Sequence, residues 1–230
     1  MPQRAALIYL YHISASLSAQ AYDQIRQMIV RVELPPGAVI REDALQARLG
    51  LGRTPIREAL QALVRDQFVT VIARRGMFVS NIDVAELGLL YETRAILEPY
   101  VTRLACLRGT DAHWADMRAV LAAAHSSPAP APELMEHDRR CHEIVWDAAG
   151  NRFLTDTLDM LYAQSDRLWH LYLADVDDMA HAVEEHEAIL GALEARDSER
   201  AADLVEAHIR AFDEQIRTAV RRRLESPLTA

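Results

Sequence analysis

The most informative stretch of this 230-residue chain is Leu49-Gly50-Leu51-Gly52-Arg53-Thr54-Pro55-Ile56-Arg57-Glu58-Ala59-Leu60. A helix over residues 42–49 is predicted before it, with Gly50 placed to supply the C-terminal turn. Thr54 is predicted as the N-cap of the next helix and Pro55 as its first residue, with its end near Asp66. The stretch therefore predicts two helices joined by a tight turn.

The flanking segments complete this unit. A first helix is expected over residues 19–31, with Ser18 as its N-cap, because apolar side chains recur there on one helical face. Leu34-Pro35-Pro36-Gly37 ends it, since proline cannot continue the hydrogen-bond ladder. Short strands are predicted over residues 68–73 and 77–80. Together these elements predict a winged helix-turn-helix domain over residues 1–80.

The rest of the chain shows helical periodicity throughout. Strand-like sequence gives way to this pattern near residues 80–83, so a second domain is expected over residues 81–230. The fold class is therefore mostly α, with an all-α antiparallel bundle as the larger domain. Its helices are predicted near residues 83–107, 111–125, 133–148, 152–173, 177–195 and 198–223.

The charge is divided unevenly along the chain. The net charge is −9, and all 25 basic residues are arginine. Residues 1–80 hold ten arginines against six acidic residues, whereas residues 81–230 hold fifteen against twenty-eight. Only the first domain is therefore expected to meet nucleic acid phosphates.

Cysteine content and hydropathy indicate a cytoplasmic protein. The two cysteines, Cys106 and Cys141, do not form a disulfide framework. No apolar run reaches the ~18–20 residues needed to cross a bilayer. The apolar residues 5–13 weakly resemble a signal peptide, but the run is short and contains His12.

The start of the second helix of a helix-turn-helix lies against base edges in the major groove. Arginine there can contact phosphates or make a bidentate contact to guanine, and a basic hairpin tip can reach the adjacent backbone. The alternative is that these arginines are ordinary solvated surface residues. The predicted DNA-binding residues are Arg53, Thr54, Pro55, Arg57, Arg74, Arg75 and Gly76.

Four residues of the second domain have the spacing of a metal site. Asp138 and His142 share one helix face at i and i+4. His186 and His208 lie at similar distances on either side of a predicted turn near residues 196–197, so antiparallel helices would place them level. Three imidazoles and one carboxylate suit a divalent transition metal. Spacing alone leaves hydrogen-bonded core histidines as the alternative, and His137, His170 and His181 as other candidate ligands.

Two arginines are candidates for binding the carboxylate of a small-molecule effector. Arg94 and Arg167 fall within otherwise apolar helical stretches, where an unpaired guanidinium would be expensive to bury. The alternative for Arg94 is a structural salt bridge to Glu98 at i+4.

Three segments of the first domain resemble the GntR family of bacterial regulators: residues 34–37, 49–60 and Arg74-Arg75-Gly76-Met77-Phe78-Val79. Two positions depart from that family's pattern. Gly52 stands where the family usually has serine or threonine, and Asp43 stands where it often has a basic residue. The operator sequence therefore cannot be carried over.

The second domain resembles the sensor domain of the FadR subgroup, called the FCD domain. The resemblance rests on residues 91–98, 138–142, 150–154 and 186–208. It implies that Asp138, His142, His186 and His208 hold a metal, Zn first with Ni and Mn as alternatives, and that small carboxylic acids bind beside it. Cys141 replaces the usual aromatic residue between two of these ligands.

These observations predict a transcriptional regulator, not an enzyme. It would act as a homodimeric repressor on a palindromic operator of double-stranded DNA, controlled by a small organic acid. One alternative is a metal-dependent hydrolase with Glu185 or Glu187 as the base. The other is a metal-free regulator with an acyl effector.

Overall fold

The computed structural model describes residues 16–83, 86–125, 131–172 and 180–225. The contacts of the chain fall into two compact units, Met1–Ile82 and Asp83–Ala230. None of the described helices is long and apolar enough to cross a membrane.

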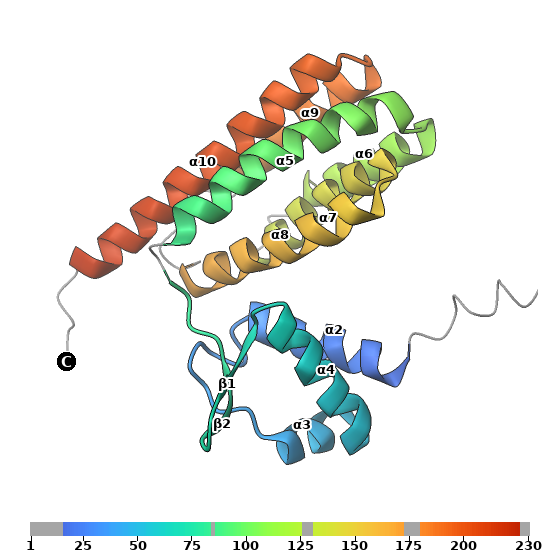
Figure 1. The fold of residues 1–230 in the computed structure, drawn as a ribbon. Coiled ribbons are helices and arrows are strands. Elements are labelled where there is room, and N and C mark those ends of the chain that lie inside the picture. The colour runs from blue at the N-terminus through green and yellow to red at the C-terminus, as the bar shows by residue number, and fades with distance from the viewer. Residues whose placement is uncertain (1–15, 84–85, 126–130, 173–179, 226–230) are drawn as a thin grey trace, which may run out of the picture. The chain divides into compact units, whose positions relative to one another are not determined.

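The first unit is the predicted winged helix-turn-helix (Figure 1). Three helices are followed by a two-stranded antiparallel hairpin. In chain order the elements are α2 (Leu17–Val30), α3 (Glu42–Leu49), α4 (Arg53–Arg65), β1 (Val69–Ile72) and β2 (Gly76–Val79).

Helix α4 holds this unit together through one apolar face. Ile56, Ala59, Leu60 and Leu63 are buried, and their 3–4 residue spacing places them on one side of the helix. They pack mainly against α2. The opposite side, with its arginines, is left to solvent. Gly50 adopts a left-handed conformation (φ 65°) at the end of α3, which lets the chain turn directly into α4.

The hairpin forms the wing. Val69 pairs with Val79 and Ile72 with Gly76, and the connecting turn requires positive φ at Arg74 (63°) and Gly76 (105°). Val39 makes a further antiparallel bridge to Phe78. The extended segment after α2 thus lies beside β2, at one edge of the two-stranded sheet.

Two predicted N-caps are wrong. The N-cap of α2 is Ser16, whose Oγ accepts a hydrogen bond from the Ala19 amide, whereas Ser18 donates to Glu58. Helix α4 begins at Arg53 with Gly52 as its N-cap, so Thr54 lies inside the helix. Proline is tolerated in any position of the first turn because those N–H groups have no intrahelical partner. A proline therefore does not fix which residue begins the helix.

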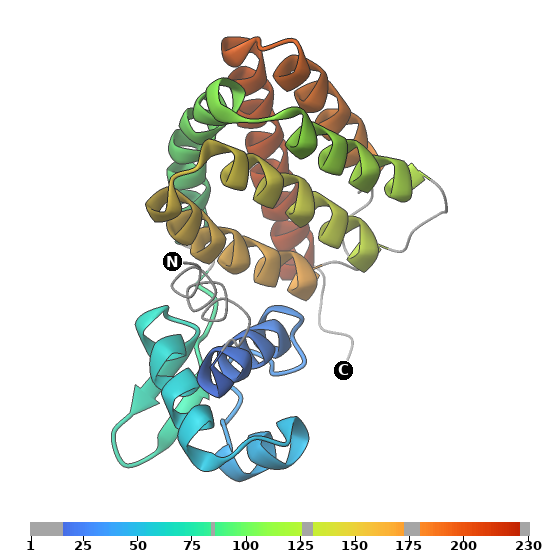
Figure 2. The ribbon, with the colours of Figure 1, turned by 90° about the vertical axis from the view of Figure 1, so that its right-hand side faces the viewer.

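The second unit is an antiparallel bundle of six described helices (Figures 1 and 2). The predicted all-helical domain is confirmed, with ends shifted by up to four residues. The helices are α5 (Leu87–Arg108), α6 (Asp111–His125), α7 (Ala131–Ala149), α8 (Arg152–Tyr172), α9 (Ala180–Glu194) and α10 (Ser198–Glu225).

The turn between α9 and α10 is fastened to the end of α5. Arg196, at positive φ (57°) in that turn, donates hydrogen bonds to the carbonyl oxygens of Cys106 (2.6 Å) and Gly109 (3.0 Å). Gly109 also lies directly under the Trp114 ring: a Cβ added there would be 2.3 Å from the ring and 2.7 Å from the Ala105 carbonyl oxygen. This close contact leaves no room for a side chain.

We therefore expect Gly109→Ala to destabilise the bundle by about 1–3 kcal/mol, the usual effect of overpacking. Thermal unfolding should show a melting temperature lower by several degrees. Gly191→Ala is the matched control: it lies in α9 with open space around it, so helix propensity should make it neutral or stabilising. Equal melting temperatures for the two variants would contradict this packing.

Candidate functional site

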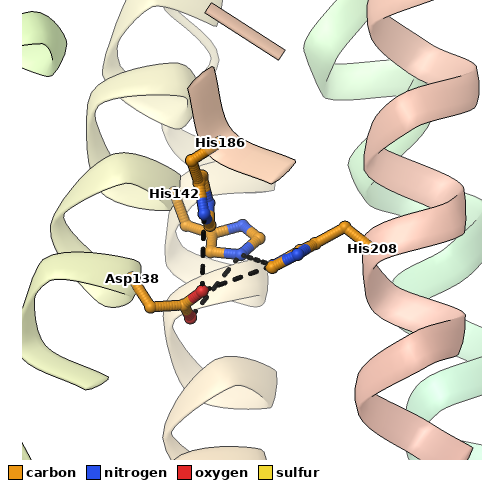
Figure 3. A group of neighbouring side chains, drawn as sticks. All are labelled: Asp138, His142, His186 and His208. Carbon is orange, nitrogen blue, oxygen red and sulfur yellow. Dashed lines mark hydrogen bonds and ion pairs between the residues drawn. The ribbon is translucent and has the colours of Figure 1, made fainter. Parts of the chain in front are cut away.

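Four buried polar side chains meet inside the bundle (Figure 3). Asp138 and His142 come from α7, His186 from α9 and His208 from α10. One donor atom of each lies within 4.8 Å of the others, and every side chain is at most 5% exposed. We call these four residues the histidine cluster.

The donor atoms of the histidine cluster converge. His208 Nε2 is 3.3 Å from Asp138 Oδ1 and 3.3 Å from His142 Nε2. His142 Nε2 is 3.8 Å from Asp138 Oδ2, and His186 Nδ1 is 3.6 Å from Asp138 Oδ1. The sequence places His186 and His208 at similar distances from the turn between α9 and α10. In the structure the centroids of their two rings are 4.5 Å apart.

Two glutamates hold two of the imidazoles from outside the cluster. His142 Nδ1 is 2.6 Å from Glu98 Oε2 on α5, and His208 Nδ1 is 2.6 Å from Glu185 Oε2 on α9. A carboxylate acceptor at Nδ1 holds the proton there, so that Nε2 is the nitrogen available to a ligand. Both Nε2 atoms point into the cluster.

The other two members are also held. His186 Nδ1 is 2.9 Å from the Ala182 carbonyl oxygen. The Tyr162 hydroxyl donates to Asp138 Oδ2 at 2.6 Å. The second carboxylate oxygen, Asp138 Oδ1, is buried and has no hydrogen bond of acceptable geometry. An acceptor left in this state is expensive unless a cation or donor completes it.

The electrostatics of the cluster favour a cation at its centre. Burial disfavours the Asp138 carboxylate, but the neighbouring imidazoles outweigh this effect and lower its pKa. Burial likewise opposes charge on His208, yet the neighbouring carboxylates of Asp138 and Glu185 raise its pKa to about 9. Burial and the neighbouring His208 lower the pKa of His186 to about 3.

This donor set fits a divalent transition metal ion. One carboxylate oxygen and three imidazole nitrogens are typical ligands of such ions. The incomplete Asp138 oxygen and the outward Nδ1 contacts of His142 and His208 to glutamates are what such a site needs. The four side chains could therefore hold a metal.

The two candidate effector residues lie in different surroundings. Arg94 Nε donates to Glu98 Oε1 at 2.6 Å, so the salt bridge considered from the sequence is present. Its guanidinium also lies 4.9 Å from the Tyr162 ring centre and lines a small cavity beside Asp138. Arg167 is 1% exposed, and burial lowers its pKa to about 10. It is not among the residues that line this cavity.

The other histidines considered from the sequence are not part of the histidine cluster. His170 lies beside Asp166, with 3.6 Å between Nε2 and Oδ1, and His181 is an exposed residue beside Glu184. Cys141 is buried, and burial raises the pKa of its thiol.

Three residues of this site were not predicted in their observed roles. Glu98 had been considered only as the salt-bridge partner of Arg94, and Glu185 only as a base. The role of Tyr162 as a donor to Asp138 left no signal in the sequence. The spacing of Glu98 four residues after Arg94 could have indicated that the two side chains are paired inside the bundle. The contact of Glu98 with His142 could not have been predicted in this way, because it depends on how α5 packs on α7.

The second site is the exposed start of α4. Arg53 and Arg57 have side chains 67% and 54% exposed, and Thr54 is exposed beside them. No side chain caps this helix end, so its first N–H groups can face an anion. Arg57 Nε lies 2.8 Å and Arg53 Nε 3.6 Å from Glu42 Oε2. Glu42 therefore holds both arginines in place without burying them.

The wing presents the remaining predicted residues. Arg74, Arg75 and Gly76 are all exposed at the hairpin turn. The Arg75 guanidinium lies 5.8 Å from the centre of the Phe78 ring. A basic tip of this kind can contact the DNA backbone or minor groove.

A winged helix-turn-helix with exposed arginines, followed by a separate helical bundle with a buried polar site, is the architecture of a class of DNA-binding transcriptional regulators. Residues 17–79 match the model for bacterial regulatory proteins of the gntR family, and residues 89–211 match the FCD domain. The chain belongs to the GntR family of transcriptional regulators and carries an FCD domain.

Characterised relatives agree with this assignment. The Nta operon transcriptional regulator of Aminobacter aminovorans is 33% identical over 195 residues, which cover 84% of this chain and 91% of that protein. The transcriptional repressor GlaR of Escherichia coli is 29% identical, over 84% of this chain and 92% of its own. The solved structure of E. coli McbR/YncC shares the fold, with a TM-score of 0.79, 20% identity and coverage of 91% and 100%.

We expect Arg57→Ala to lower the affinity for operator DNA by about 1–3 kcal/mol, the usual value of one bidentate base contact. Affinity for unrelated DNA should fall much less. Both affinities can be measured by gel shift, with an operator selected from a random DNA pool.

Arg65→Ala is the matched control for this experiment. It removes the same charge from the other end of the same helix, roughly 12 Å further along the axis at 1.5 Å per residue. An equal loss on operator and unrelated DNA for Arg57→Ala would identify Arg57 as a phosphate contact instead.

Proposed function

We propose that this protein is a cytoplasmic transcriptional repressor whose operator binding is controlled by a small carboxylic acid bound at a metal ion. The metal would be held by Asp138, His142, His186 and His208, with Zn as the first choice and Ni or Mn as alternatives. The observation that carries this proposal is the buried convergence of the histidine cluster, with each imidazole held from outside.

The proposed acid would bind where the cluster meets its cavity. A bound metal ion would act as a Lewis acid that attracts a carboxylate oxygen. Arg94 would supply a second positive group, because its Nε is used by Glu98 while its side chain still lines the cavity. Arg167 is a second candidate that would need a rearrangement of α8 to reach the same acid.

The cavity beside the cluster suggests how the acid changes the protein. Its volume is about 10 Å³, which holds about one water molecule. A carboxylic acid must therefore open the surrounding helices, and it will favour the opened state because only that state binds it. The segment near residues 80–83 would transmit this change to the winged helix-turn-helix.

Specific binding by so small a reading domain usually needs two copies on a palindrome. We therefore propose that the repressor acts as a homodimer on double-stranded DNA. The wing residues Arg74, Arg75 and Gly76 would contact DNA beside Arg53, Thr54, Pro55 and Arg57. Repression is proposed from the name of GlaR, a related repressor.

The structure lends less support to the two alternative functions. A hydrolase would need a free base, but Glu185 accepts a hydrogen bond from His208, and Glu187 is a surface residue 3.7 Å from His125. A metal-free acyl regulator would leave the four converging polar side chains of the histidine cluster without a role.

The proposed function is tested by His208→Ala. Wild-type protein purified without chelators should carry about one transition metal ion per chain, measured by elemental analysis. A panel of small carboxylic acids should include one that raises the wild-type melting temperature and releases operator DNA. The variant should lose the metal and both responses while still binding the operator.

His181→Ala is the control, because it removes an exposed histidine from the helix that carries His186. It should keep metal and acid responses. A His208→Ala protein that retains one ion per chain would show that the proposed ligand set is wrong. Wild-type protein that responds to an acid with no metal bound would contradict the role of the metal.

The hydrogen bond between His208 and Glu185 predicts that changing Glu185 weakens metal binding without abolishing it. Glu185→Gln replaces a carboxylate acceptor by an amide at the same distance from His208, so metal affinity should fall by about 10–100-fold. Competition with a chromophoric chelator measures this directly. Glu184→Gln changes the neighbouring exposed glutamate and should leave affinity unchanged; the same loss in both variants would point to net charge alone.

A further inference from the structure

The two oxygens of the Asp138 carboxylate have different surroundings. Oδ1 is 3.3 Å from His208 Nε2 and 3.6 Å from His186 Nδ1, and Figure 3 marks both contacts. It has no hydrogen bond of acceptable geometry. Oδ2 accepts a hydrogen bond from the Tyr162 hydroxyl at 2.6 Å and is 3.8 Å from His142 Nε2. One oxygen is therefore open to the centre of the histidine cluster, whereas the other already has a partner.

The Tyr162 side chain is fixed in this position by its neighbours. Its ring centre is 4.9 Å from the Arg94 guanidinium, and the ring centres of His142 and Trp146 are 5.3 Å and 5.8 Å away. Only 5% of Tyr162 is exposed. Because side chains in a close-packed interior have few alternative rotamers, the hydroxyl cannot leave Asp138 without a movement of the surrounding helices.

The hydrogen bond from Tyr162 to Asp138 is of the strong kind. A phenol has a pKa of about 10, so it is protonated at neutral pH and has a single O–H to donate. An O–H group that donates to an ionised carboxylate forms a short, charge-assisted bond, and the observed distance of 2.6 Å is typical of one. This bond draws electron density from Oδ2 and fixes the plane of the carboxylate, so Oδ1 is left as the better metal ligand.

The number of carboxylate oxygens that bind affects which ion a site prefers. Zn is usually satisfied by four ligands, and three imidazoles with one carboxylate oxygen supply them. Ions that prefer oxygen ligands and a higher coordination number, such as Mn, gain more from the second oxygen of a carboxylate. A carboxylate held to one oxygen therefore favours Zn.

We propose that Tyr162 makes Asp138 a one-oxygen ligand and thereby favours Zn over Mn at the histidine cluster. Tyr162 is a positioning residue in this scheme, because its hydroxyl acts on the ion only through Asp138. The inference rests on the metal ion of the proposed function and decides between two of the ions named there.

The test is Tyr162→Phe in the full chain, which removes the hydroxyl and keeps the ring beside Arg94 and His142. Sites with nitrogen and oxygen ligands generally bind Zn more tightly than Mn, so the informative quantity is the change in preference. The dissociation constants of both ions are measured by competition with a chromophoric chelator. The ratio of the Mn constant to the Zn constant should fall by about tenfold or more, the lower end of effects from groups behind the ligands.

Tyr91→Phe is the matched control. Tyr91 is a second buried tyrosine, 2% exposed, and its hydroxyl accepts a hydrogen bond from Trp169 Nε1 at 3.0 Å. Its loss removes the same group from the core of the same domain and should leave the ratio unchanged. Equal weakening of both ions in Tyr162→Phe would reduce Tyr162 to a structural role and overturn the inference, as would the same change of ratio in both variants.

A second measurement needs no variant. Infrared difference spectra compare the Zn-loaded and metal-free wild-type chain, with ¹³C in the aspartate carboxyl groups to separate them from the glutamates. One aspartate should show the wide separation of its two carboxylate stretching bands that is typical of binding through one oxygen. A narrow separation, typical of binding through both oxygens, would overturn the inference.

The same titrations separate this inference from the proposed function. Wild-type protein that binds neither ion overturns both. Wild-type protein that loses Zn on His208→Ala, but keeps its ratio of constants on Tyr162→Phe, overturns the inference alone and leaves the proposed metal site standing.

Discussion

The arrangement of helices in the larger domain depends on the free-energy cost of burying a carboxylate and three imidazoles inside an apolar bundle. Each of these groups loses its water on folding, so each needs a partner from the protein. Glu98, Glu185, Tyr162 and the Ala182 carbonyl supply those partners. They come from α5, α8 and α9, so the polar site fixes how those helices must lie around α7 and α10.

One demand is left unmet within the described chain. Asp138 Oδ1 is buried without a hydrogen bond, while the neighbouring His208 holds a proton with a pKa raised to about 9. A cation held by the histidine cluster, as proposed above, would complete this oxygen.

Helix α5 has one face in the buried polar site and another exposed to solvent. Its inner face carries Arg94 and Glu98, which are almost completely buried. Its outer face carries the exposed apolar residues Leu89, Ile96, Tyr100 and Leu107. A shift of this helix in response to a bound acid would therefore be felt at both faces. In the winged helix-turn-helix, by contrast, the polar groups are at the surface: Glu42 contacts Arg57 and Arg53, and both arginine side chains stay more than half exposed.

Much of this could be predicted from the chain alone. The winged helix-turn-helix followed from Gly50, Pro55 and apolar spacing, because turns and helix faces depend on residues close in sequence. The spacings of Asp138 with His142, and of His186 with His208 about a turn, indicated the residues that meet in the histidine cluster. The predicted helix starts were less accurate, since proline is tolerated at several positions of the first turn.

What the tertiary structure decided were the contacts between helices. The sequence shows that Arg94 can reach Glu98, but not that the same glutamate holds His142 from another helix. It shows a tyrosine at 162, but not that its hydroxyl holds Asp138. These contacts depend on the rotation and height of one helix against another. Those quantities are set by the packing of whole faces, and no local pattern of residues encodes them.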